Sequence, residues 1–194
     1  MTARRKSAAS LDDREILVCV CGGIAAYKTA ALVSALAQRG CGVTVAMTRN
    51  AKRFIGPVTF EALTGRPVAL SMWARHTGEI QHLSLSESVD LIVVAPATAN
   101  ILAKLAGGIA DDLVSSSLLG AACPVLLAPA MNSRMWQHPA TQRNVAWLRD
   151  NGFEFIGPEA GWQACRAHGV GRMSEPDAIL AAIETHLRKS PKRR

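Results

Sequence analysis

Near the N-terminus the chain reads Ile16-Leu17-Val18-Cys19-Val20-Cys21-Gly22-Gly23, an apolar run that ends at two glycines. A continuous apolar run of this kind is typical of a parallel strand buried on both faces. Residues 25–39 follow with apolar side chains at helical spacing and Gly40 as a stop signal, and residues 43–47 form a second apolar run. The opening of the chain therefore predicts one β-α-β unit.

The same alternation continues to the C-terminus. It predicts further strands at 91–95, 124–128 and 153–156, and further helices at 51–63, 99–106, 112–121, 140–150 and 177–188. Alternation of this kind indicates an α/β fold, a Rossmann-like open parallel sheet with helices on both faces, formed as a single domain. Ligands of such sheets bind beyond the carboxyl ends of the strands, so the loops there are the candidate site.

Composition indicates a globular chain with a sizeable core. Of the 194 residues, 49% are hydrophobic and 19% are charged, and no apolar run approaches the roughly 18 residues that cross a bilayer. Arg4, Arg5 and Lys6 are not followed by a signal-peptide core, so we expect a cytoplasmic protein with no membrane partner. Five cysteines without a Cys-x-x-Cys pair predict neither a disulfide framework nor a metal site.

The formal net charge of +7 at first favours nucleic acid as a partner. However, much of this charge lies at the two ends, whose basic residues are Arg4, Arg5, Lys6, Arg188, Lys189, Lys192, Arg193 and Arg194. We therefore predict disordered basic tails at 1–14 and 188–194 around a near-neutral domain at 15–187. Nucleic acid remains an alternative for the tails alone.

The turn after the first strand contains Gly22 and Gly23 and opens a helix. Free N–H groups and the helix dipole at such a turn favour an anion, although a plain tight turn is the alternative. The segment lacks the G-x-G-x-x-G pattern of dinucleotide sites, and Tyr27 stands where a P-loop needs glycine. The second strand is followed by Thr48, whose hydroxyl can donate a hydrogen bond to a phosphate, and not by an acidic residue that would bind an adenosine ribose. The turn therefore favours a mononucleotide such as FMN over NAD or ATP.

Each of the polar side chains in the later loops has both a functional and a structural interpretation. Thr98 and Asn100 follow the third main strand, where capping of the next helix explains Thr98 as well as ligand binding does. The Asn132 amide can receive a carboxylate, or serve as a polar turn residue. His82 is a lone histidine, more often structural than catalytic. Cys165 lies in a long glycine-containing loop at 161–173, which is typical of a lid. It is interpreted either as a reactive cysteine or as an ordinary loop cysteine.

Together these segments resemble the flavin-dependent cysteine decarboxylase family, in the branch that acts on phosphopantothenoylcysteine in coenzyme A biosynthesis. The resemblance covers roughly 16–180 and rests on motifs at 22–28, 95–100, 108–113, 129–132 and 164–173. It implies FMN as cofactor and a homotrimer or a multiple of trimers. In many bacteria this domain is fused to a phosphopantothenate–cysteine ligase, and we expect any such ligase to be a separate protein here.

The resemblance also implies roles for individual residues. The implied cofactor-binding residues are Gly22, Gly23, Ile24, Thr48, Pro96, Ala97, Thr98, Ala99 and Asn100. The implied substrate-binding residues are Met131, Asn132, Arg172 and Met173, with Lys104 or Arg134 as candidates for the substrate phosphate. His82 and Cys165 are the implied catalytic residues, and no metal is expected.

By the same resemblance, the substrate is oxidised to a thioaldehyde at the expense of FMN, with His82 assisting proton removal. The product loses CO₂, and re-reduction with a proton from Cys165 gives 4′-phosphopantetheine. One alternative is a non-catalytic flavin-binding regulatory subunit, because Arg166 replaces the glycine that commonly follows the flap cysteine. A peptidyl-cysteine decarboxylase is disfavoured by Cys165. A flavin prenyltransferase is disfavoured by the motif at 129–132 together with His82.

Overall fold

A parallel five-stranded sheet forms the centre of the computed structural model, which describes residues 11–73 and 85–189. Its strands run in the order β2-β1-β3-β4-β5. They are β1 (Glu15–Val20), β2 (Gly42–Met47), β3 (Leu91–Ala97), β4 (Val125–Pro129) and β5 (Glu154–Phe155). From β1 the chain adds β2 on one side of the sheet and then crosses over to add β3 on the other side. The order in which strands are added therefore reverses between β1 and β3. Ligands of open sheets bind at such a switch point.

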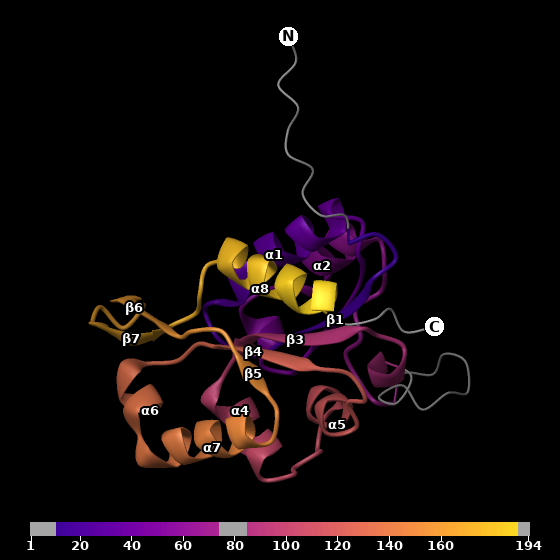
Figure 1. The fold of residues 1–194 in the computed structure, drawn as a ribbon. Helices are drawn as coiled ribbons and strands as arrows, with labels where there is room; N and C mark the ends of the chain where they lie inside the picture. Colours follow the sequence, from indigo (N-terminus) through magenta and orange to yellow (C-terminus); the bar gives the residue numbers. More distant parts are fainter. Residues whose placement is uncertain (1–10, 74–84, 190–194) are drawn as a thin grey trace.

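Helices cover both faces of the sheet (Figure 1), as predicted. One face carries α1 (Ala26–Gln38), α2 (Pro57–Thr64) and α8 (Pro176–Lys189). The other carries α4 (Ala99–Ala106), α5 (Leu113–Leu119), α6 (Ser133–Gln137) and α7 (Pro139–Asp150). Alternate residues of β1 supply the two cores, because successive strand side chains point to opposite faces. No helix of the described part is long and apolar enough to span a membrane.

The helix predicted near 51–63 is confirmed only in its second part, α2 (Pro57–Thr64). The chain instead forms a short 3-10 helix, η1 (Ala51–Arg53), and begins α2 only at Pro57. Gly56 is extended, with φ −77° and ψ 147°, because a proline disfavours helical backbone at the residue before it. The five-residue helix α6 is not predicted, since one turn is too short to show a periodic pattern.

The segment predicted as a loop at 161–173 is instead, up to Arg172, part of an antiparallel hairpin that extends beyond the edge of the main sheet (Figure 1). Its strands are β6 (Glu159–Trp162) and β7 (His168–Arg172). We call this hairpin, residues 159–172, the flap. It packs closely on the start of α6, where a Cβ on Gly169 would lie 2.8 Å from Ser133 Cβ. A Cβ on Gly171, which has φ +150°, would overlap the carbonyl oxygen of Met131.

Candidate active site

A cleft opens beyond the carboxyl ends of β1 to β4, where the loops after these strands meet the flap. Its volume of about 1450 Å³ exceeds the roughly 300–1,000 Å³ of typical small-molecule pockets, which leaves room for two ligands. The cleft lies over the β1/β3 switch point, where the topology places a ligand. Residues 11–73 and 85–189 contain no group of three His, Cys, Asp or Glu side chains that could hold a metal ion.

The two glycines after β1 serve different purposes. A Cβ on Gly22 would lie 2.6 Å from Asn50 Cβ, so Gly22 lets the loop after β1 pass the loop after β2. A Cβ on Gly23 would lie 3.6 Å from Thr98 Cγ2, an ordinary contact, so packing alone does not require glycine there. Helix α1 starts with no side-chain cap and no acidic residue in its first turn. An uncapped helix start beside glycines favours an anionic group.

The loop after β2 adds positive charge to the same part of the cleft. Arg49, Lys52 and Arg53 are exposed and line the cleft. Among the described residues none of the three takes part in an ion pair. Thr48 Oγ1 accepts a hydrogen bond from Ala51 N at 3.3 Å, which leaves its hydroxyl proton to donate. This loop therefore has cations and a hydroxyl that suit a phosphate.

The loop after β3 is organised by a cap. Thr98 Oγ1 accepts a hydrogen bond from Ile101 N at 3.4 Å and caps α4, so the capping interpretation is confirmed. Thr98 also lines the cleft, together with Ala99 and Asn100. The other two predicted cofactor residues of this segment, Pro96 and Ala97, are buried at the end of β3 and do not line the cleft.

Lys104 lines the cleft as part of a charge cluster rather than as a free cation. Its Nζ donates to Asp111 Oδ1 at 2.5 Å and to Asp112 Oδ2 at 2.8 Å. Burial opposes ionisation of Asp112, but hydrogen bonds from Lys104 and from Ser115 outweigh it and lower the pKa of this carboxyl. Lys104 is therefore neutralised, and Arg134 does not line the cleft, so neither candidate suits the substrate phosphate.

The flap brings two predicted site residues together. Asn132 Nδ2 donates a hydrogen bond to Cys165 Sγ at 3.1 Å, although the two are 33 residues apart. Asn132 Oδ1 accepts from Arg134 N at 2.8 Å and caps α6, which fixes the amide with its NH₂ group toward the flap. Cys165 is exposed at the tip of the flap. A thiol and an amide donor thus face each other at the mouth of the cleft.

The base of the flap is tied to α1 by charge. Nζ of the buried Lys28 donates to Glu175 Oε1 at 2.9 Å and to the carbonyl of Met173 at 3.4 Å. Arg172 forms an ion pair with the same carboxylate. The hydrogen bond from Lys28 is the main cause that lowers the pKa of Glu175. Arg172 and Met173, two predicted substrate-binding residues, therefore lie on the cleft wall in fixed positions.

Cys21 and Cys165 both line the cleft but differ in reactivity. Burial raises the pKa of Cys21 to about 12, so this thiol stays protonated at neutral pH. Cys165 is the exposed one. His82, the predicted proton-transfer residue, lies outside the described residues, and its role stays a prediction.

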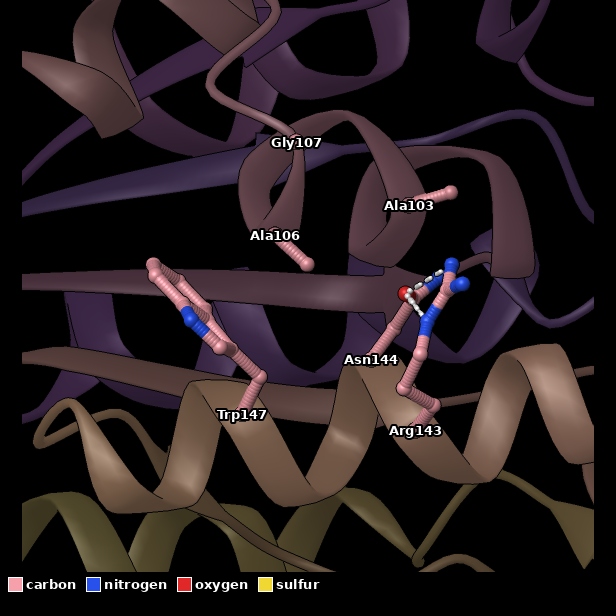
Figure 2. A pocket seen from close by; sticks show the side chains of 6 residues that line it. All are labelled: Ala103, Ala106, Gly107, Arg143, Asn144 and Trp147. Atoms are coloured by element: carbon pink, nitrogen blue, oxygen red, sulfur yellow. Dashed lines mark hydrogen bonds between the residues drawn. The ribbon is translucent and has the colours of Figure 1, made fainter.

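A second, smaller pocket of about 210 Å³ lies between α4 and α7 (Figure 2). It is lined by Ala103, Ala106, Gly107, Arg143, Asn144 and Trp147. The Arg143 guanidinium donates two hydrogen bonds to Asn144 Oδ1, one from Nε at 3.4 Å and one from Nη2 at 3.1 Å. No nucleophile or acid lines this pocket, so it does not compete with the cleft as a site of chemistry.

Comparisons with known proteins identify the family of the chain. A model of a family described as Flavoprotein matches residues 4–188. The chain belongs to the flavoprotein family. The resemblance expected from the sequence motifs is thereby confirmed at the level of the family.

Similar proteins place the chain more closely within this family. It is 46% identical over 178 residues to the coenzyme A biosynthesis bifunctional protein CoaBC of Bacillus subtilis, covering 91% of this chain and 44% of that protein. The solved structure of SpaF, titled an FMN-dependent cysteine decarboxylase, has a TM-score of 0.79 and 34% identity, over 92% of this chain and 98% of that one. A PPC decarboxylase variant complexed with pantothenoylaminoethenethiol has a TM-score of 0.81 and 27% identity, over 91% and 99%.

The chain spans less than half the length of the curated relatives that it matches. Several residues of the cleft were not singled out from the sequence, among them Gln163, Lys28, and the cations at 49–53. For the cations, the run Arg49-Asn50-Ala51-Lys52-Arg53 directly after a strand was an available signal. No sequence signal marked Gln163, because its role depends on contacts with residues that are distant in the sequence.

Proposed function

We propose that this chain is an FMN-dependent decarboxylase that converts 4′-phosphopantothenoylcysteine into 4′-phosphopantetheine. The observation that carries the proposal is the contact between Asn132 and Cys165 over a cleft at the β1/β3 switch point. A carboxylate receptor and a proton donor are the two groups that a reductive decarboxylation needs next to each other. Similarity to a CoaBC protein and to a PPC decarboxylase structure supports this choice of substrate.

The cleft fits FMN. Gly23 leaves open the space between the loops after β1 and β3, the uncapped start of α1 favours an anion, and Thr48 has a hydroxyl proton to donate. Gly22, Gly23, Ile24 and Thr48 would therefore hold the phosphate side, and Thr98 to Asn100 the ring and ribityl side. FMN supplies the reversible removal and return of a hydride.

The residues of this chain supply binding and proton transfer. The Asn132 amide receives the substrate carboxylate through Nδ2, the atom that contacts Cys165 here. Once the cysteinyl group has become a thioaldehyde, loss of CO₂ leaves an ene-thiolate and releases Asn132 from the carboxylate. The Cys165 thiol then delivers a proton, and the exposed cations Arg49, Lys52 and Arg53 attract the phosphate groups of both ligands. In this proposal His82 removes the proton of the first step.

Other features stay predictions. A homotrimer or a multiple of trimers, a cytoplasmic location and a phosphopantothenate–cysteine ligase as partner activity are all part of this proposal. The bifunctional relatives support the ligase as an associated activity, since the chain covers 44% of the Bacillus subtilis protein. Sedimentation of the FMN-loaded protein tests the trimer.

The test is a product assay on FMN-loaded protein. Incubation with 4′-phosphopantothenoylcysteine is expected to release CO₂ and to yield 4′-phosphopantetheine, identified by mass spectrometry. Pantothenoylcysteine, which lacks the phosphate, serves as the matched substrate and is expected to need a higher concentration for the same rate. Absence of both CO₂ and product from flavin-loaded protein would overturn the proposal, and release of the enethiol alone would indicate an oxidative decarboxylase instead.

A further inference from the structure

Gln163 lies in the flap, buried beside the predicted catalytic cysteine, with 8% of its surface exposed. Its Oε1 accepts a hydrogen bond from Ser133 N at 3.1 Å, and its Nε2 donates to the carbonyl of Met131 at 3.4 Å. A Cβ on Gly171 would lie 2.6 Å from the same Nε2, so the side chain is enclosed between the flap and the start of α6. Both ends of this amide are thus fixed by the fold.

The same amide also contacts the thiol. Cys165 Sγ lies 3.6 Å from Gln163 Oε1, a distance at which a thiol donates a hydrogen bond. On its other side, Sγ accepts from Asn132 Nδ2 at 3.1 Å. The thiol therefore donates a hydrogen bond to one amide and accepts a hydrogen bond from the other. Each of these two amides is held in place by its own hydrogen bond from a backbone N–H group.

We propose that Gln163 is a positioning residue, which holds the Cys165 thiol in its protonated form next to Asn132 and so directs the reaction to the reduced thiol product. This inference rests on the proposed function. Gln163 lines the cleft with only 8% of its surface exposed, and its amide is taken up by Ser133 N, the Met131 carbonyl and the Cys165 thiol. In this proposal it acts on the reaction through Cys165.

The step in question needs a proton and a hydride. Decarboxylation leaves a carbon–carbon double bond next to a thiolate, and its α-carbon takes the proton of the Cys165 thiol, which regenerates a thioaldehyde. FMN, when bound, would supply the hydride that the adjacent carbon needs to complete the reduction. The S–H bond of Cys165 breaks, a C–H bond forms, and Cys165 remains as a thiolate that accepts the Asn132 N–H and regains its proton from water. Without a poised S–H, the enethiol leaves first.

The first experiment measures product partition. Gln163→Leu removes the acceptor, and the ratio of enethiol to 4′-phosphopantetheine is expected to rise roughly five- to tenfold, the effect of one hydrogen bond, while CO₂ formation continues. Gln163→Glu keeps an acceptor oxygen of the same shape and is expected to restore most of the reduced product. Gln38→Leu, on the exposed surface of α1, is the matched control and is expected to behave as wild type.

The second experiment needs no activity. The rate at which iodoacetamide labels Cys165 in the FMN-bound protein, mapped by peptide mass, is followed against pH. An acceptor stabilises the protonated thiol, so Gln163→Leu is expected to shift the midpoint to lower pH and Gln163→Glu, with its negative charge, to higher pH. The charged groups nearby, Arg166 and His168 on the flap and Arg134 on α6, are the same in all variants.

The two readouts separate the possible failures. If wild type forms no CO₂, the proposed function fails, and the labelling profiles still test the contact between Gln163 and Cys165. If wild type decarboxylates but neither the partition nor the labelling midpoint differs between Gln163→Leu, Gln163→Glu and Gln38→Leu, the positioning role is overturned. A variant that merely loosened the flap would shift both Gln163 midpoints in the same direction, which also contradicts the proposal.

Discussion

Gly23 keeps one wall of the cleft open through a single missing carbon. A Cβ there would meet only Thr98 Cγ2 at 3.6 Å and Pro96 Cγ at 3.8 Å, so Gly23→Ala is expected to fold normally. The added methyl occupies the space into which the flavin is proposed to fit, and the FMN dissociation constant is expected to rise about tenfold, equivalent to about 1.4 kcal/mol. Flavin fluorescence titration of the apoprotein measures this.

The control for Gly23 is a glycine that does not line the cleft and has free space around it. A Cβ on Gly56 would meet no atom within 4 Å, and Gly56→Ala is expected to leave FMN affinity unchanged. Equal FMN affinity in Gly23→Ala and wild type would contradict the proposed position of the flavin.

Arg166 adopts a left-handed backbone conformation, with φ +61°, at the tip of the flap. This backbone conformation costs a non-glycine residue about 1–2 kcal/mol in the folded state, a cost that glycine avoids. Glycine, however, loses about 0.5–1 kcal/mol of stability because its unfolded state is more flexible. Arg166→Gly is therefore expected to stabilise the domain by about 0.5 kcal/mol in urea unfolding. The residue that departs from the family pattern thus carries strain in the flap.

Arg143→Gly provides the contrast for Arg166, because Arg143 lies inside helix α7. There glycine is expected to destabilise the domain by about 1 kcal/mol. Equal destabilisation by both substitutions would mean that the positive φ of Arg166 has no energetic consequence.

Helix α5 depends on one acidic cap. Asp112 Oδ1 accepts from Ser115 N at 2.8 Å, and Oδ2 accepts from Lys104. Asp112→Ala is expected to cost about 1 kcal/mol at pH 7. Because the folded pKa of Asp112 is lowered, its ionised form stabilises the fold above the unfolded pKa of about 3.9 and loses this effect as pH falls through the folded value.

The difference between wild type and Asp112→Ala is therefore expected to shrink below about pH 4, measured by urea unfolding of the apoprotein. Asp150→Ala, at the exposed end of α7, is the control for removal of a carboxylate that is not an N-cap. A difference that stays constant from pH 7 to pH 3 would show that the charge of Asp112 is irrelevant to the cap.

At the scale of elements, long periodic segments could be predicted and short or context-dependent ones could not. The strand at 16–21 and the helix at 25–39 show their period directly, and the structure has both. The helix predicted near 51–63 is divided into η1 and α2, because Gly56-Pro57 interrupts an apolar pattern that otherwise looks helical. The flap lacks alternation in its glycine-containing strands, which are held by their contacts with residues 131–133.

At the scale of the molecule, the strand order assembles the site. Parallel strands bring their carboxyl ends to one edge, which is why Gly22, Thr48, Thr98 and Asn132 could be predicted to share a cleft from their positions after strands. The separate roles of Asn132 and Cys165 came from the family resemblance, and their direct contact was not predicted. The support of Cys165 by Gln163 could not be predicted, since it depends on how the flap docks on α6.

The most direct test of the central claim is the product formed by Cys165→Ser in the FMN-loaded protein. Because Cys165 is proposed as the proton donor that completes the reduction, this variant is expected to release CO₂ and to accumulate the enethiol, which lacks two hydrogens of 4′-phosphopantetheine. Cys123→Ser, at a half-buried cysteine that does not line the cleft, is expected to form the saturated product as wild type does. Undiminished 4′-phosphopantetheine from Cys165→Ser would contradict the account.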